Sequence, residues 1–129
     1  MFSHITVGVS DLDCAGRFYD AVLAPLGLGQ RKVEPDGGPA SLCWIAQNWP
    51  LPRFYAYRPF NGEPNTAGNG SMVAFLAPTH SAVEQAYAQG LANGGKDDGP
   101  PGPRLQYGPA YFGAYLRDPD GNKIHIVYR

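Results

Sequence analysis

The sequence predicts an α+β fold of two βαβββ modules in one chain, whose curved mixed sheets enclose a small-molecule cavity. Its 129 residues suit a single domain, since domains run most often to about 100–150 residues. An alternating apolar segment followed by a helical pattern occurs twice, beginning near residues 4 and 72. The 17 Gly and 13 Pro indicate many turns. We therefore expect one domain over residues 1–129, with module one at 1–60, a linker at 61–70 and module two at 71–129.

The first module is expected to open with a strand over residues 4–9, where every second residue is apolar. A helix follows, because Ser10 with Asp13 three residues later suits an N-terminal cap and Gly27 suits a stop. The apolar stripe of this helix is Leu12, Ala15, Tyr19, Val22, Leu23 and Leu26. Turn-rich segments then separate three strands, expected near residues 29–34, 40–46 and 53–58.

The second module repeats this order. Residues 72–77 alternate like the first strand, Thr79 opens a helix and Gly94 closes it. The apolar positions of this helix are Ala82, Val83, Ala86, Tyr87, Gly90 and Leu91. Strands are expected near residues 96–98, 111–117 and 122–128. Residues 118–121, Asp-Pro-Asp-Gly, form a strong turn signal between the last two strands, with Pro suited to position i+1.

A weak internal repeat supports the division into modules. Placing residue 44 against residue 115 aligns the segments without a gap, so that Trp44 meets Tyr115 and His4 meets Met72. The identity is low, and the order of the elements therefore carries more weight than the matching letters.

Charge and composition exclude several classes of function. Ten basic and eleven acidic residues give a net charge of −1, and no basic cluster exceeds the pair Arg31 and Lys32, so a nucleic-acid interface is not expected. The chain contains neither a secretory signal pattern nor an apolar run of about 20 residues, so no membrane contact is expected. Cys14 and Cys43 lack the spacing of a metal or redox motif. A cytoplasmic protein with free thiols is the expectation.

Four stretches resemble the vicinal oxygen chelate superfamily: HITVGVSDL at 4–12, RFYDAVLAPLG at 17–27, GNGSMVAF at 68–75 and RDPDGNKI at 117–124. That superfamily includes glyoxalases, extradiol dioxygenases and bleomycin-resistance proteins. The resemblance covers nearly the whole chain and implies the glyoxalase/bleomycin-resistance fold, a small-molecule ligand and a homodimer. It is specific for the fold and for no single reaction.

The resemblance also implies positions for metal ligands, on the first and last strands of each module. The matching residues are His4 and His125, and the remaining two positions fall on Met72, where His is common, and near Phe54. His125 stands where the superfamily usually has Glu. The alternation of the strands places both histidines opposite the aliphatic residues, so both are expected to face one cavity. Imidazole suits Zn, Fe, Ni or Cu, and the expected cofactor is one divalent metal ion, Zn, Ni, Mn or Fe.

The expected pocket residues are Trp44, Phe54, Met72, Tyr111 and Tyr115, because pockets are lined mainly by aromatic and apolar groups. Arg53 and Arg58 are candidate clamps for a carboxylate or phosphate. No catalytic residue can be named. Three functions stay open: a metal-dependent lyase, isomerase or dioxygenase at His4 and His125; a metal-free protein that binds or sequesters a small molecule; and an interaction domain with a vestigial pocket.

Overall fold

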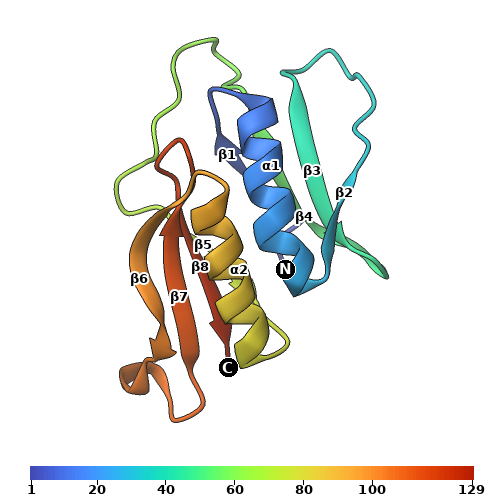
Figure 1. Cartoon of the computed structure of the whole chain (residues 1–129). Coiled ribbons are helices and arrows are strands. Elements are labelled where there is room, and N and C mark those ends of the chain that lie inside the picture. Colours follow the sequence, from blue (N-terminus) through green and yellow to red (C-terminus); the bar gives the residue numbers. More distant parts are fainter.

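The computed structural model describes residues 1–129 as two sheets covered on one side by two helices, α1 and α2 (Figure 1). The elements of the first half are β1 (His4–Gly8), α1 (Leu12–Leu23), a 3-10 turn (Ala24–Leu26), β2 (Leu28–Arg31), β3 (Ser41–Ala46) and β4 (Trp49–Tyr57). Those of the second half are β5 (Val73–Leu76), α2 (His80–Ala92), β6 (Lys96–Pro103), a 3-10 turn (Leu105–Tyr107), β7 (Phe112–Arg117) and β8 (Lys123–Tyr128). Neither helix is long and apolar enough to cross a membrane.

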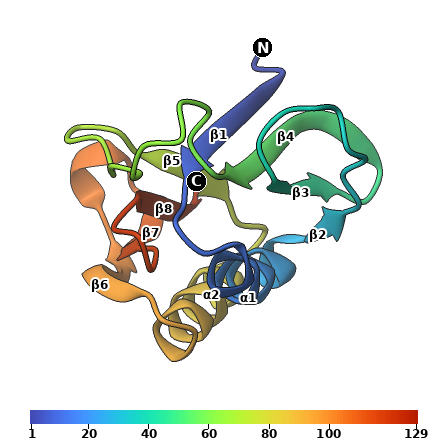
Figure 2. The ribbon, with the colours of Figure 1, turned by 90° about the horizontal axis from the view of Figure 1, so that it is seen from above.

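Both sheets have the same topology, which confirms the predicted α+β class with two βαβββ modules. The first has the strand order β1-β4-β3-β2 and the second β5-β8-β7-β6. In each, the first strand pairs in parallel with the last, and the other pairs are antiparallel. Viewed from above, α1 and α2 lie side by side beneath sheets that curve away from them (Figure 2). Each sheet therefore has one face against a helix and one open face.

The ends of the helices follow the local sequence, with one correction. Thr79 caps α2 as expected, because its hydroxyl accepts a hydrogen bond from the backbone N–H of Ala82 at 3.0 Å. The cap of α1 is Asp11, not Ser10: the Asp11 carboxylate accepts from the N–H of Cys14 at 3.0 Å. Gly27 takes a φ of 81° and ends the first helical segment as predicted.

Two strands differ from their predicted bounds. β4 begins at Trp49 instead of residue 53, so its first half extends the hairpin with β3. β6 runs from Lys96 to Pro103 instead of ending at 98, although it contains three prolines. Proline is tolerated there because β6 is an edge strand, where backbone N–H groups can remain unpaired.

The core lies between the helices and the sheets. Tyr19 of α1 packs its ring 4.8 Å from that of Phe54 and 5.4 Å from that of Trp44, and all three are buried. α2 packs closely against the second sheet at Gly90, where an added Cβ would lie 2.6 Å from the Leu116 side chain. The strand faces that carry these residues are therefore closed by the helices.

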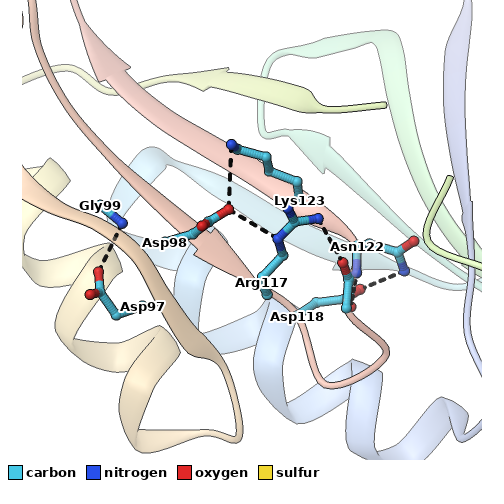
Figure 3. Close-up of polar contacts among 8 residues, drawn as sticks. Asp97, Asp98, Gly99, Arg117, Asp118, Asn122 and Lys123 are labelled. Atoms are coloured by element: carbon cyan, nitrogen blue, oxygen red, sulfur yellow. Dashed lines mark hydrogen bonds and ion pairs between the residues drawn. The ribbon is translucent and has the colours of Figure 1, made fainter. Parts of the chain in front are cut away.

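A buried carboxylate joins the two halves. Asp118, in the β7–β8 turn, accepts hydrogen bonds from the Tyr19 hydroxyl at 2.7 Å and from the backbone N–H of Asn122 at 2.8 Å. Asn122 in turn donates to the Gly8 carbonyl at 2.8 Å. Figure 3 shows this turn beside Asp98, which pairs with Arg117 and Lys123 at 3.0 and 3.4 Å. Burial raises the pKa of Asp118 despite these donors.

Candidate functional site

Strand register decides which side chains reach the open faces. In the first sheet Phe54 pairs with Trp44 and Ile5 on the helix side. His4 and its partner Arg53 therefore fall on the open face, because successive side chains of a strand alternate. In the second sheet, Ile124 and Leu116 lie on the buried helix side. The open face of that sheet then carries His125 and its partner Tyr115.

This register corrects the internal repeat by one residue. Phe54 corresponds to Ile124, since each is the core residue of the last strand of its sheet. The counterpart of His125 is therefore Tyr55, not Phe54. Likewise, Trp44 corresponds to Leu116 and not to Tyr115. A shift of one residue along a strand moves every side chain to the opposite face.

A pocket of about 450 Å³ lies on the open face of the first sheet. Its lining residues are Ser3, His4, Thr6, Val33, Asp36, Gly38, Pro39, Ser41, Leu51, Arg53, Tyr55 and Tyr57. They come from β1 and the residue before it, from β3 and β4, and from the loop between β2 and β3. The volume lies within the roughly 300–1,000 Å³ typical of small-molecule sites.

Within this pocket, Tyr55 contacts both Arg53 and His4. The Arg53 guanidinium donates to the Tyr55 hydroxyl at 3.4 Å and to the Pro50 carbonyl at 3.3 Å. The hydrogen bond to Tyr55 raises the pKa of Arg53. The His4 ring stands edge-on to the Tyr55 ring, with centroids 5.8 Å apart, and its Nδ1 lies 3.1 Å from the Ser3 hydroxyl.

His125 has a different environment on the second sheet. Its Nδ1 lies 2.9 Å from the Ala114 carbonyl, which can only accept, so Nδ1 carries the proton. Its Nε2 is then free to accept from the Tyr111 hydroxyl, 2.9 Å away. The ring is almost fully buried, and burial lowers the pKa of His125. His125 is therefore a neutral imidazole with both nitrogen atoms engaged.

The surrounding chain holds the His125 ring in place. The ring stacks on Tyr115 at 4.1 Å and lies 5.8 Å from the Tyr111 ring. Gly113, between those two tyrosines in sequence, leaves the space that the ring occupies: a Cβ there would lie 2.5 Å from the His125 ring. Arg104 lies over Tyr115 as well, at 5.8 Å from its centroid.

The structure separates the five predicted pocket residues. Trp44 and Phe54 are buried in the core with Tyr19 and do not line the first-sheet pocket, because the register turns them toward α1. Met72 is 45% exposed, immediately before β5. Tyr111 and Tyr115 are the two residues of the set that contact a predicted histidine, namely His125.

The predicted metal pair does not fit a metal ion as the side chains stand. His4 and His125 have separate sets of partners, and no hydrogen bond or ring contact joins them. Both nitrogen atoms of His125 are engaged, so a metal would have to displace Tyr111. No three His, Cys, Asp or Glu side chains form a group that could hold a metal, whereas catalytic zinc sites use three protein ligands.

Several pocket residues were not singled out from sequence. Tyr57, Thr6 and Ser41 reach the pocket through strand pairing, and Asp36 reaches it through the β2–β3 loop. The sequence does contain a pattern that indicates one of these residues, Tyr57. Arg53, Tyr55 and Tyr57 occupy every second position of β4, which places their side chains on one face of the strand.

Comparison with known proteins identifies the family. The sequence profile described as the Glyoxalase/Bleomycin resistance protein/Dioxygenase superfamily matches residues 1–126. The chain belongs to this superfamily. Among solved structures, a glyoxalase/bleomycin resistance protein from Albidiferax ferrireducens T118 is 40% identical with a TM-score of 0.85, over 100% of this chain and 98% of that one.

Other solved structures share the fold at lower identity. A glyoxalase-related enzyme from Fulvimarina pelagi is 20% identical with a TM-score of 0.72, over 100% of this chain and 88% of that chain. A lactoylglutathione lyase from Agrobacterium tumefaciens is 19% identical with a TM-score of 0.64, over 99% and 92%. No curated protein matches the chain.

Proposed function

We propose that this superfamily member binds a small organic molecule in the first-sheet pocket without a metal ion. The observation that carries the proposal is the pocket itself: about 450 Å³ on the open face, lined by His4, Arg53, Tyr55 and Tyr57. Rings on neighbouring strands supply flat apolar walls, and the hydroxyl and guanidinium groups supply directional hydrogen bonds. The protein then acts by holding its ligand, as a sequestering protein does.

A plugged pocket tests this proposal. Thr6 lies on the pocket face of β1, so Thr6→Trp should fill the space while keeping a residue that favours strands. The matched control is Ala88→Trp, at an exposed position of α2. We expect planar aromatic compounds to raise the melting temperature of the wild type and of Ala88→Trp but not of Thr6→Trp. Equal binding by Thr6→Trp would place the ligand elsewhere and reject the proposal.

A metal-dependent lyase, isomerase or dioxygenase at His4 and His125 is the second candidate. Its support is that His4 lines the pocket and that the superfamily description includes dioxygenases. The engaged nitrogen atoms of His125 count against it. Metal analysis of the purified wild type, His4→Ala and His125→Ala decides: about one ion per chain, lost in both variants, would favour this candidate over metal-free binding.

We also propose a homodimer. The support is the exposure of large apolar residues on or near β1 and β4: Phe2 is 74%, Trp49 72% and Leu51 45% exposed. Phe2 lies beside the backbone pairing of Ser3 with Arg53 of β4, and exposed apolar patches often mark contacts between proteins. Sedimentation equilibrium should give twice the 13.9 kDa mass of the chain, and a monomer at all concentrations would reject the dimer.

A further inference from the structure

The chain supplies no negatively charged partner for Arg53. Its two hydrogen bonds go to neutral oxygens, the Pro50 carbonyl and the Tyr55 hydroxyl. The ion pairs of the structure join other residues: Lys32 with Glu34, and Arg117 and Lys123 with Asp98. A guanidinium held in position and half-buried in a pocket, with no carboxylate of its own, is suited to bind an anion from outside, with two parallel hydrogen bonds where the geometry allows.

The rings beside Arg53 define the remainder of the ligand. Tyr55 and Tyr57 are two residues apart on one face of β4, so their Cα atoms lie about 7 Å apart along the strand. The His4 ring stands edge-on to Tyr55. Val33 and Leu51 add aliphatic surface. A flat ring fits such walls better than a flexible polar chain, since aromatic pairs favour stacked or edge-on contacts.

We infer that the pocket selects planar aromatic carboxylates, with Arg53 binding the carboxylate and Tyr55, Tyr57 and His4 surrounding the ring. This inference rests on the proposed function and names the class of its ligand.

Asp36 sets the direction and the charge of that ligand. It lines the same pocket from the β2–β3 loop and makes no ion pair with Arg53. Its Oδ1 accepts from the backbone N–H of Gly38 at 2.8 Å, which holds the carboxylate within the loop. A ligand with a second negative charge would be repelled by Asp36, whereas one with a hydroxyl or amino group at the far end would be accepted. Monoacids are therefore favoured over diacids.

A matched pair of ligands tests the inference. Titration calorimetry compares 2-naphthoate with 2-naphthamide, which has the same ring and nearly the same shape but no charge. The wild type should bind the acid about 10-fold or more tightly than the amide, because hydrogen bonds to charged groups contribute roughly 1.5–3 kcal/mol. Arg53→Gln should remove that preference, and Arg53→Lys should keep part of it, since the charge remains but the two-pronged donor is lost.

Arg58→Gln is the control variant, because Arg58 directly follows the last residue of β4 and does not line the pocket. It should leave the preference for the acid unchanged, and the thermal melts of all variants should show that they fold.

Equal affinity for acid and amide in the wild type would overturn the inference while leaving the proposed function standing. So would an acid preference that survives Arg53→Gln. Failure of both compounds would also overturn the inference, and the comparison of Thr6→Trp with Ala88→Trp over a wider set of compounds would then decide the proposed function separately.

Discussion

The open faces of the two sheets have the same topology but differ in how they are filled. On the first sheet, His4, Arg53 and Tyr55 surround a pocket of about 450 Å³. On the second, the corresponding position of Tyr55 holds His125, which is buried between Tyr111 and Tyr115. The imidazole nitrogens there are engaged by the chain itself.

The difference shows how one backbone topology can yield a surface with a pocket or a packed surface. The deciding residues are small. Gly113 leaves space for the His125 ring to lie across β7, whereas its counterpart in the first sheet, Ser41, lines the open pocket instead. The first face is therefore the better candidate for an external ligand, and the second face mainly stabilises the fold.

The largest effect is expected from closing the space under His125. Gly113→Ala places a Cβ 2.5 Å from the His125 ring and 3.1 Å from the Ile126 carbonyl, so the ring must leave its site. We expect a loss of about 1–3 kcal/mol in the free energy of unfolding, as for other overpacked sites. Urea denaturation measures it. Ser41→Ala, at the equivalent position of the first sheet, should cost much less, and equal losses would refute the contrast between the faces.

Removing one hydroxyl from each face gives the next largest difference. Tyr111→Phe deprives Nε2 of His125 of its donor and should cost about 1–2 kcal/mol, because a buried acceptor is left unsatisfied. Tyr55→Phe removes only a 3.4 Å hydrogen bond from Arg53 in an open pocket, so it should cost less than about 0.5 kcal/mol. Thermal melts of the two variants compare them directly. A costlier Tyr55→Phe would contradict the assignment of roles.

The pH dependence of stability should follow His125. Its pKa is lowered in the folded state by burial, so below the ordinary value of 6.5 the unfolded chain takes up a proton before the folded one does. Stability should therefore fall as pH drops from 7.5 through 6.5, until the folded imidazole is itself protonated. Burial raises the pKa of Asp118, which acts in the opposite direction at lower pH.

The His125 contribution can be isolated by denaturation of His125→Gln alongside the wild type at pH 7.5, 6.5 and 5.5. Asp118 is present in both proteins, so the difference between their slopes belongs to His125. The variant should show the shallower decline. His4→Gln controls for the loss of one imidazole at the exposed face. Identical slopes for wild type and His125→Gln would contradict a buried neutral imidazole.

The smallest predicted effect concerns ligand charge. Asp36→Asn removes a carboxylate from the pocket and should strengthen the binding of an aromatic monoacid about two- to threefold at low salt, since exposed charges interact weakly in water. A diacid should gain more than the monoacid. Calorimetry at 20 mM and 200 mM salt measures the effect, which should shrink at the higher salt. Weaker acid binding by Asp36→Asn would reverse the direction assigned to the ligand.

The features that could be predicted correctly from the sequence are those that several residues indicate together. The two modules, the caps at Thr79 and Gly27 and the turn at 118–121 each rest on several residues that agree. It failed for Trp44 and Phe54, which pack under α1 instead of lining a pocket. The cause is the strand period of two: an alignment error of one residue reverses a face, and weak identity between modules cannot detect it.

The pocket itself could be predicted only in part. The alternation of Arg53, Tyr55 and Tyr57 is visible in the sequence, but their meeting with Asp36 depends on the course of the β2–β3 loop, which no periodic pattern describes. For His125, Tyr111 and Tyr115 were named from the sequence as pocket residues, but their contacts with its ring were not predicted. Tyr111, Gly113 and Tyr115 follow each other at intervals of two, and only the strand pairing shows that His125 lies across from them.

The buried Asp118 has a consequence for the order in which the chain acquires its structure during synthesis. The Tyr19 hydroxyl finds its acceptor 99 residues downstream, and the carbonyl of Gly8 is met by a side chain 114 residues away. An amino-terminal half that has left the ribosome alone would lack this carboxylate, and its Tyr19 hydroxyl would bond to water instead. Although the architecture is doubled, the nascent protein can complete its first half only when its last hairpin has been translated.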